Sequence, residues 1–191
     1  MNSSRYPYVN TLVFKVMPSV DTQIMNLKNG NIDLMGLVPP KRLPELFGST
    51  SIEVSIQDAY GFGFLVFNTR RYPFNLSKFR EAFNYLVDKD RMVSEILMGY
   101  GARLDSVVPP IYGEWHNPSV PRRDFDPQLA NSTISQVALS EGWHFSEGWW
   151  KYANGSRIEI ELLAVQWDQV MIDVATMVHE IATKIGLYTF V

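Results

Sequence analysis

The clearest pattern of apolar and polar positions lies in residues 60–101. Residues 62–67 are almost all apolar, which predicts a strand buried on both faces. After a proline-containing turn, apolar residues recur at steps of three and four, which predicts a first helix. Its inward positions are Phe79, Ala82, Phe83 and Leu86. Asp88 can then cap a second helix, and Gly99 or Gly101 can end it in the left-handed conformation.

The first sixty residues alternate between strand-like and helix-like patterns. The strand-like segments are residues 11–17, 32–35 and 52–56. Between the first two, Asp21 can cap a helix that Asn29 and Gly30 end. Strands that alternate with helices in this way are typical of an α/β fold.

The second half of the chain begins with a connection and then returns to regular elements. Residues 107–123 are rich in proline and have no periodicity, so we expect a loop there. Asp126 and Pro127 can open a helix that runs to about residue 140. Residues 157–163 alternate as a strand, and Asp168 can cap a last helix. The apolar stripe of that helix is formed by Met171, Val174, Val178, Ile181 and Ile185.

Composition limits the class of protein. The chain has 191 residues, 19% of them charged, and a formal net charge of −3, with no basic run. These values argue against a nucleic-acid partner. No apolar run reaches the ~18 residues that a membrane span needs. The chain has no cysteine, so disulfides and thiolate chemistry are excluded.

Several motifs occur in an order that resembles one known family. They are FLVFNT at 64–69, YPF at 72–74 and FREAFNYLVDKDRMVSEILMGYG at 79–101. In this order they resemble the extracellular solute-binding proteins of family 5, which deliver oligopeptides, dipeptides or nickel to ABC transporters. The segments IMNLKNGNIDLMGLVPP at 24–40 and FDPQLANSTISQVALSEGW at 125–143 are similar to further parts of the family pattern.

The resemblance implies a fold and a division of the chain. We expect partial lobes of the periplasmic-binding-protein-like type II fold, which are α/β with mixed sheets. Residues 1–104 would belong to lobe I, residues 105–118 to the inter-lobe connection and residues 119–191 to lobe II. Members of the family are two to three times longer and are exported, which implies an internal piece of a protein whose full length includes a signal peptide.

The resemblance also implies a function outside the cytoplasm. The whole protein would capture an oligopeptide between two lobes and deliver it to an ABC permease, without a cofactor and without a chemical step. The same fold could instead bind an oligosaccharide or a metal chelate, or it could be the ligand-sensing domain of a regulator.

Aromatic and polar residues at strand ends and in loops are candidate ligand contacts. In open α/β sheets, ligands lie beyond the carboxyl ends of strands and against helix N-termini, which is where residues 166 and 167 are expected. We therefore predict that six residues bind ligand: Tyr60, Phe62, Tyr112, Trp115, Gln166 and Trp167. Trp143 follows a helix stop and is expected to be structural, whereas for Trp149 and Trp150 both interpretations remain open.

Residue patterns for metal binding or catalysis are weak. His116, His144 and His179 do not have the spacing of a zinc motif, so no metal site is predicted. Asp88 and Asp90 are better explained as charges at a helix start than as an acid/base pair. With no nucleophile motif either, we expect that the protein is not an enzyme.

Overall fold

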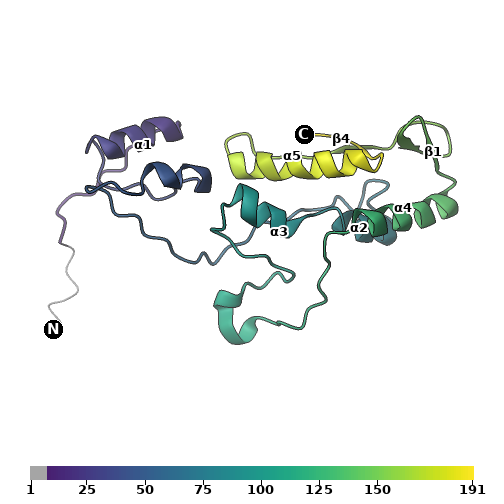
Figure 1. The fold of residues 1–191 in the computed structure, drawn as a ribbon, viewed down its shortest axis with the longest axis horizontal. Coiled ribbons are helices and arrows are strands. Elements are labelled where there is room, and N and C mark those ends of the chain that lie inside the picture. Colours follow the sequence, from purple (N-terminus) through teal and green to yellow (C-terminus); the bar gives the residue numbers. More distant parts are fainter. Residues whose placement is uncertain (1–7) are drawn as a thin grey trace. The chain divides into compact units, whose positions relative to one another are not determined.

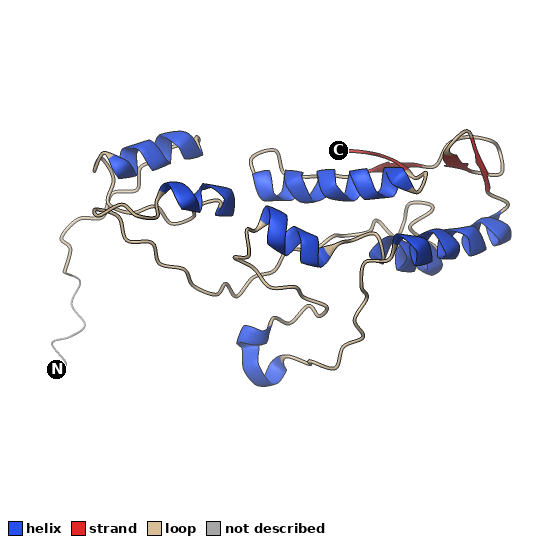
Figure 2. Cartoon of the chain, viewed as in Figure 1, coloured by secondary structure: helices blue, strands red, loops and turns tan. Residues whose placement is uncertain are grey.

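The computed structural model of the chain describes residues 8–191. The chain divides into two compact units. The first unit ends at Val54, and the second begins at Ser55. Figure 1 labels the main elements along the chain, and Figure 2 separates helices from strands. Because the two units are not placed relative to each other, each is described by itself.

The described part of the first unit, residues 8–54, contains two short helices. Helix α1 is Val20–Lys28, and η2 is a 3-10 helix, Pro40–Glu45. The predicted helix is confirmed, but its cap is Ser19, whose hydroxyl accepts a hydrogen bond from the Thr22 N–H at 3.4 Å. Asp21 lies in the first turn instead and forms an ion pair with Arg42 at 2.5 Å.

Four predicted strands are not formed. Residues 11–17, 32–35, 52–56 and 62–67 form no ladder with any part of the chain that the structure describes. Phe14 and Phe64 are 85% and 71% exposed, although their segments have the apolar character of strands. A strand is stabilised by the N–H and C=O groups of a neighbour, and a local apolar pattern cannot show whether that neighbour is present. The prediction that residues 62–67 are buried on both faces is therefore wrong for this chain.

Five helical segments of the second unit lie where the sequence pattern predicts a helix. They are α2 (Ser77–Asn84), α3 (Lys89–Arg91), the π-helical turn η3 (Met92–Ile96), α4 (Pro127–Glu141) and α5 (Gln169–Lys184). Three predicted caps are confirmed: the carboxylates of Asp88, Asp126 and Asp168 each accept a hydrogen bond from the backbone N–H three residues later. Each carboxylate thereby satisfies one of the unpaired N–H groups of the first turn.

Two small sheets complete the second unit. Strands β1 (His144–Ser146) and β2 (Trp149–Lys151) form an antiparallel hairpin. Strands β3 (Glu159–Glu161) and β4 (Tyr188–Phe190) are parallel, with Ile160 opposite Thr189, and α5 crosses between them. The strand predicted at 157–163 is thus confirmed at its centre, as one half of a βαβ unit.

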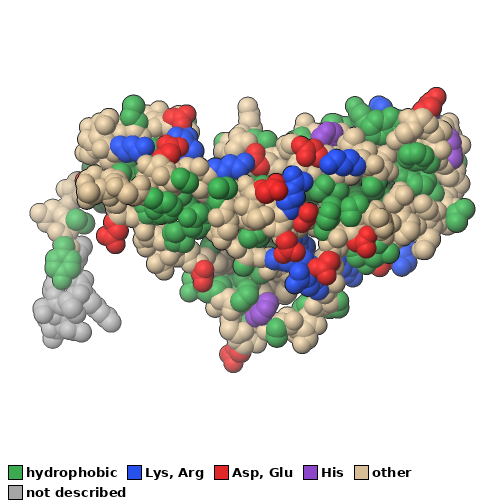
Figure 3. All heavy atoms as spheres, in the orientation of Figure 1, with side chains coloured by type: hydrophobic (Ala, Val, Ile, Leu, Met, Phe, Trp, Pro, Cys, Tyr) green, Lys and Arg blue, Asp and Glu red, His purple; other side chains and the backbone are tan. Residues whose placement is uncertain are grey.

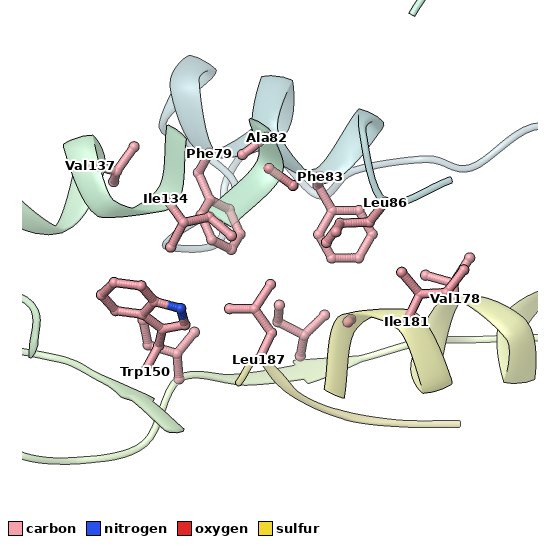
Figure 4. Packing of buried hydrophobic residues seen from close by; sticks show 14 of the residues in the cluster. Phe79, Ala82, Phe83, Leu86, Ile134, Val137, Trp150, Val178, Ile181 and Leu187 are labelled. Carbon is pink, nitrogen blue, oxygen red and sulfur yellow. The ribbon is translucent and has the colours of Figure 1, made fainter. Parts of the chain in front are cut away.

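The core of the second unit lies between two layers of elements. Figure 4 shows side chains of α2 and α4 facing side chains of α5 and the adjoining strands. Those labelled there are Phe79, Ala82, Phe83, Leu86, Ile134, Val137, Trp150, Val178, Ile181 and Leu187. The core joins residues from both sides of the connection expected at 105–118. The assignment of these residues to two lobes of a longer protein stays a prediction.

Candidate functional site

A pocket of about 320 Å³ lies in the second unit. It is lined by Tyr60, Phe62, Val107, Val108, Pro109, Tyr112 and Trp115. One wall comes from the extended chain before α2. The other comes from the proline-rich connection and from η4, a short 3-10 helix, Pro110–Trp115. Figure 1 shows η4 in teal-green, below the labelled helices of this unit.

Tyr112 links the two walls of the pocket through a hydrogen bond and a ring contact. The Tyr112 hydroxyl donates a hydrogen bond to the Tyr60 backbone carbonyl at 3.1 Å. The two rings also meet edge to face, with centroids 5.6 Å apart and an interplanar angle of 66°. This arrangement places the positive edge of one ring against the negative face of the other. Residues 52 positions apart in the sequence thus hold the pocket together.

The turn around η4 is shaped by a histidine and a glycine. His116 Nδ1 donates a hydrogen bond to the Val108 carbonyl at 2.6 Å, which closes the loop on itself. Because the acceptor is a carbonyl, Nδ1 must carry a proton. Gly113 has φ 58° and ψ −117°, a backbone conformation that residues with a Cβ atom rarely adopt. This turn orients Tyr112 and Trp115 on the pocket wall.

The lining of the pocket is apolar and aromatic. None of its seven side chains is ionisable at neutral pH, and the polar side-chain groups are tyrosine hydroxyls and the indole N–H of Trp115. Trp115 and Tyr60 are 75% and 66% exposed, so the rings line an open site instead of a closed core. Such a surface removes apolar atoms from water when something binds.

Charged residues gather where the connection leaves the helices and where it returns. Arg103, Asp105 and Asp124 form ion pairs there with the first turn of α3 and with each other. The hydrogen bond from Arg103, together with one from Lys89, lowers the pKa of Asp105 to about 2. In Figure 3, acidic and basic side chains lie next to each other over the visible face of this unit.

Four of the six predicted ligand residues come together in the pocket, and two do not. Tyr60, Phe62, Tyr112 and Trp115 line it. Gln166 and Trp167 lie in the turn before α5 and are not part of the lining. Trp167 is 85% exposed. The role of all six as ligand contacts stays a prediction.

Sequence reasoning missed three lining residues, Val107, Val108 and Pro109. The signal that could have found them is their position in the same proline-rich segment as Tyr112 and Trp115. Aliphatic residues in a loop without periodicity predict a connection and not a binding wall. Pro109 is in fact buried, although its neighbours Val107 and Pro110 are exposed.

Two other features are not found in the part of the chain that the structure describes. Within residues 8–191, no group of three or more His, Asp or Glu side chains is placed to hold a metal ion. Over the same residues, no helix has both the length and the apolar character needed to cross a membrane.

The sequence matches a known family over nearly its whole length. The family described as bacterial extracellular solute-binding proteins, family 5 Middle, matches residues 3–189. The dipeptide-binding protein of Escherichia coli (strain K12) is 24% identical over 181 residues, which are 91% of this chain and 33% of that protein. The chain thus spans about a third of the length of the curated relatives it matches.

Solved structures of similar fold agree with this match. The oligopeptide-binding protein AppA of Bacillus subtilis, in complex with a nonapeptide, has a TM-score of 0.72 at 21% identity, over 92% of this chain and 34% of that one. NikZ of Campylobacter jejuni, in complex with Ni(L-His), has a TM-score of 0.72 at 22% identity, over 92% and 34% of the two chains. The predicted fold class, partial α/β lobes of the periplasmic-binding-protein type, is confirmed.

Proposed function

Since the chain belongs to family 5 of the bacterial extracellular solute-binding proteins, we propose that it is part of a longer protein that captures an oligopeptide outside the cytoplasm. That protein would hold the peptide between two lobes and deliver it to an ABC permease. Binding and lobe closure are the whole of this function, and no bond in the solute is made or broken.

The observation that carries the choice of an oligopeptide is the lining of the pocket. Aromatic and aliphatic walls without an ionisable side chain favour an apolar side chain of the ligand over a charged one. A volume of about 320 Å³ is at the lower end of the range for ligand sites, roughly 300–1,000 Å³. The pocket therefore suits one part of a peptide, with the peptide backbone and ends bound elsewhere.

The energy expected from this contact is large enough to measure. Burying one Phe or Leu side chain contributes roughly 1.5–3 kcal/mol. Because about 1.4 kcal/mol changes a dissociation constant tenfold, a tripeptide with a central Phe should bind at least about tenfold more tightly than one with a central Ala. A central Glu should bind weakly, since its carboxylate would lose water without gaining a partner.

One structural observation favours a second candidate, an oligosaccharide. The ring of Trp115 is 75% exposed on the pocket wall and offers a flat surface on which a sugar ring can stack. The predicted alternatives of a metal chelate and of a ligand-sensing role in a regulator have no comparable feature in the pocket. The same titration should therefore include sugars and Ni(II)-histidine.

Isothermal titration calorimetry of the full-length protein tests the proposal. Ala-Phe-Ala, Ala-Ala-Ala, Ala-Glu-Ala, maltotriose and Ni(II)-histidine would be titrated separately. We expect Ala-Phe-Ala to bind most tightly. We also expect Trp115→Ala to weaken its binding, whereas Leu139→Ala, at an 87% exposed position on α4, should leave binding unchanged.

Two results would contradict the proposal. Binding of maltotriose or Ni(II)-histidine without binding of any peptide would replace the oligopeptide as the solute. If peptide binding does not change with Trp115→Ala or with the central side chain of the tripeptide, the pocket is not part of the ligand site.

A further inference from the structure

The outer wall of the pocket lacks the support that fixes the other elements. Residues 104–123 carry five of the seven lining residues. None of residues 104–123 belongs to the hydrophobic core of this unit or packs against it as a partly buried apolar residue. Burial of apolar side chains holds most elements of a protein in place, so other contacts must hold this segment.

A single guanidinium contacts both ends of this segment. At the entry, Arg103 Nε and Nη2 donate hydrogen bonds to the two carboxylate oxygens of Asp105, at 2.9 and 3.2 Å. At the exit, Nη2 also donates to the Arg123 carbonyl at 2.9 Å, and Nη1 lies 2.9 Å from an Asp124 carboxylate oxygen. The side chain of Arg103 is only 10% exposed.

The same guanidinium anchors these ends to a helix. Arg103 Nη1 donates a hydrogen bond to Asp90, in the first turn of α3, at 2.7 Å. The neighbouring Lys89 donates to Asp105 at 2.6 Å. Helix α3 leads into η3, whose Ile96 is part of the core. Arg103 thereby connects the entry and the exit of the segment to the helix that leads into the core.

Only arginine has the geometry for this arrangement. Its planar guanidinium directs five N–H donors along fixed lines, so that it can form a paired contact with one carboxylate while it reaches other acceptors. Lysine has a compact charge at one point and cannot reproduce the paired contact with Asp105. The side chains of Arg103 and Asp105 are only 10% and 19% exposed, which limits screening of this pair by water and salt.

We propose that Arg103 is a positioning residue for the ligand pocket, which it serves by fixing both ends of residues 104–123 to the first turn of α3. The wall formed by Val107, Tyr112 and Trp115 then stays opposite Tyr60 without support from the core. This inference rests on the proposed function, because the pocket must bind the solute for its wall to affect affinity. It makes Arg103 a determinant of affinity that contacts no ligand.

The test compares Arg103→Gln with Arg91→Gln in the full-length protein. Arg91 is a matched control, since it lies on the same helix and its ion pair with Glu95 is on the exposed surface. Hydrogen–deuterium exchange measures protection of residues 104–123, with α4 as the internal reference. Calorimetry with Ala-Phe-Ala as the probe measures affinity, and thermal unfolding measures the stability of the core.

Arg103→Gln should speed exchange in residues 104–123 at least about tenfold and weaken Ala-Phe-Ala binding about tenfold, because a preorganised wall has become mobile. Exchange in α4 should not change. Arg103→Lys should behave like Arg103→Gln, because it keeps the charge but loses the paired contact. Arg91→Gln should match the wild type in exchange and in affinity.

A second variant covers the case in which Arg103→Gln fails to fold because Asp105 is left without its main partner. In Arg103→Gln combined with Asp105→Asn, both charges are removed together, and the same changes in exchange and affinity are expected.

Three results would overturn the inference. The first is unchanged hydrogen exchange of residues 104–123 in Arg103→Gln and in the double variant with Asp105→Asn. The second is faster exchange with unchanged affinity for Ala-Phe-Ala. The third is full rescue by Arg103→Lys. If the wild type does not bind Ala-Phe-Ala at all, the proposed function fails, and the exchange measurement still reports whether Arg103 fixes the segment.

Discussion

Tyr72 joins two helix-end residues through one hydroxyl group. Trp143 Nε1 donates a hydrogen bond to the Tyr72 hydroxyl at 2.7 Å, and that hydroxyl donates to Glu141 at 2.9 Å. The rings of Tyr72 and Trp143 also meet edge to face, with centroids 5.9 Å apart. Trp143 is 6% exposed, so its N–H depends on this partner. The prediction of a structural Trp143 is consistent with this contact.

Removing that hydroxyl should destabilise the second unit. Tyr72→Phe leaves the buried Trp143 N–H without an acceptor, which should cost about 1–2 kcal/mol of unfolding free energy. Urea denaturation at neutral pH measures the loss. Tyr100→Phe, at an exposed tyrosine, is the control and should change stability little. Equal stability of the two variants would show that water replaces the lost acceptor.

The same hydroxyl predicts a loss of stability in alkali. Burial, together with the hydrogen bond to Glu141, raises the pKa of Tyr72 from 10.0 to about 12. A raised pKa means that the folded state favours the protonated phenol, so this contribution is complete below pH 10 and is lost as the pH rises toward 12. Urea denaturation from pH 8 to 12 should show a flatter decline for Tyr72→Phe than for the wild type.

Asp105 predicts the opposite dependence, in acid. The hydrogen bond from Arg103 lowers the pKa of Asp105 from 3.8 to about 2. A lowered pKa means that the folded state favours the carboxylate, so its contribution is present above pH 3.8 and is lost as the pH falls toward 2. Hydrogen exchange of residues 104–123 should increase over that range in the wild type. In Asp105→Asn it should already be fast at neutral pH, whereas Asp58→Asn, at an exposed position outside the helices and strands, should follow the wild type.

Helices α2 and α4 pack against each other in the core of the second unit. Phe79 and Phe83 of α2 are almost fully buried, as is Ile134 of α4, and Figure 4 shows them in the same layer. Leu129, near the start of α4, is 41% exposed, and Met171, the first residue of the stripe expected for α5, is 47% exposed. The first turns of these helices therefore face solvent more than a regular stripe predicts.

A truncation in this contact should be severe. Phe83→Ala should cost about 3–5 kcal/mol of unfolding free energy, because a 1% exposed ring is replaced by a cavity among close-packed neighbours. Urea denaturation monitored by circular dichroism measures it. Leu139→Ala removes an apolar side chain from an 87% exposed position of α4 and should have little effect. Similar losses for both variants would contradict the packing described for Phe83.

At the scale of the whole molecule, the chain spans about a third of the length of the curated relatives it matches. The pocket is open, and its walls offer no charged partner for the ends of a peptide. Charged ends need paired hydrogen bonds when water is removed from them. A second surface that closes over the pocket would supply them in a two-lobed protein.

We therefore predict that this 191-residue chain alone binds peptide weakly or undetectably. Hydrogen bonds to charged groups contribute roughly 1.5–3 kcal/mol each, and every 1.4 kcal/mol lost weakens binding about tenfold. Calorimetry with Ala-Phe-Ala, performed on this chain and on the full-length protein, measures the difference. Equal submicromolar affinity would show that the complete site lies within these residues.

The candidate site was only partly predictable from the sequence. Aromatic residues in loops identified Tyr60, Phe62, Tyr112 and Trp115, because exposed rings outside helical stripes suggest a binding surface. The sequence could not show that Tyr112 bonds to the Tyr60 carbonyl, or that Gln166 and Trp167 do not line the same pocket. Which loops lie near each other depends on contacts between distant segments, and local patterns do not record them.

Helices α2, α4 and α5 follow from local order along the chain, because an apolar stripe and a capping carboxylate act within a few residues of each other. Family membership likewise follows from the order of motifs. Strand pairing does not, since each strand needs a partner that can be anywhere in the protein. The strand predicted at residues 157–163 pairs with β4. Residues 11–17 and 62–67 have no paired strand among the residues described. The pocket and the contacts of Arg103 also could not be predicted from the sequence. Both join residues that only the folded chain brings within hydrogen-bond distance.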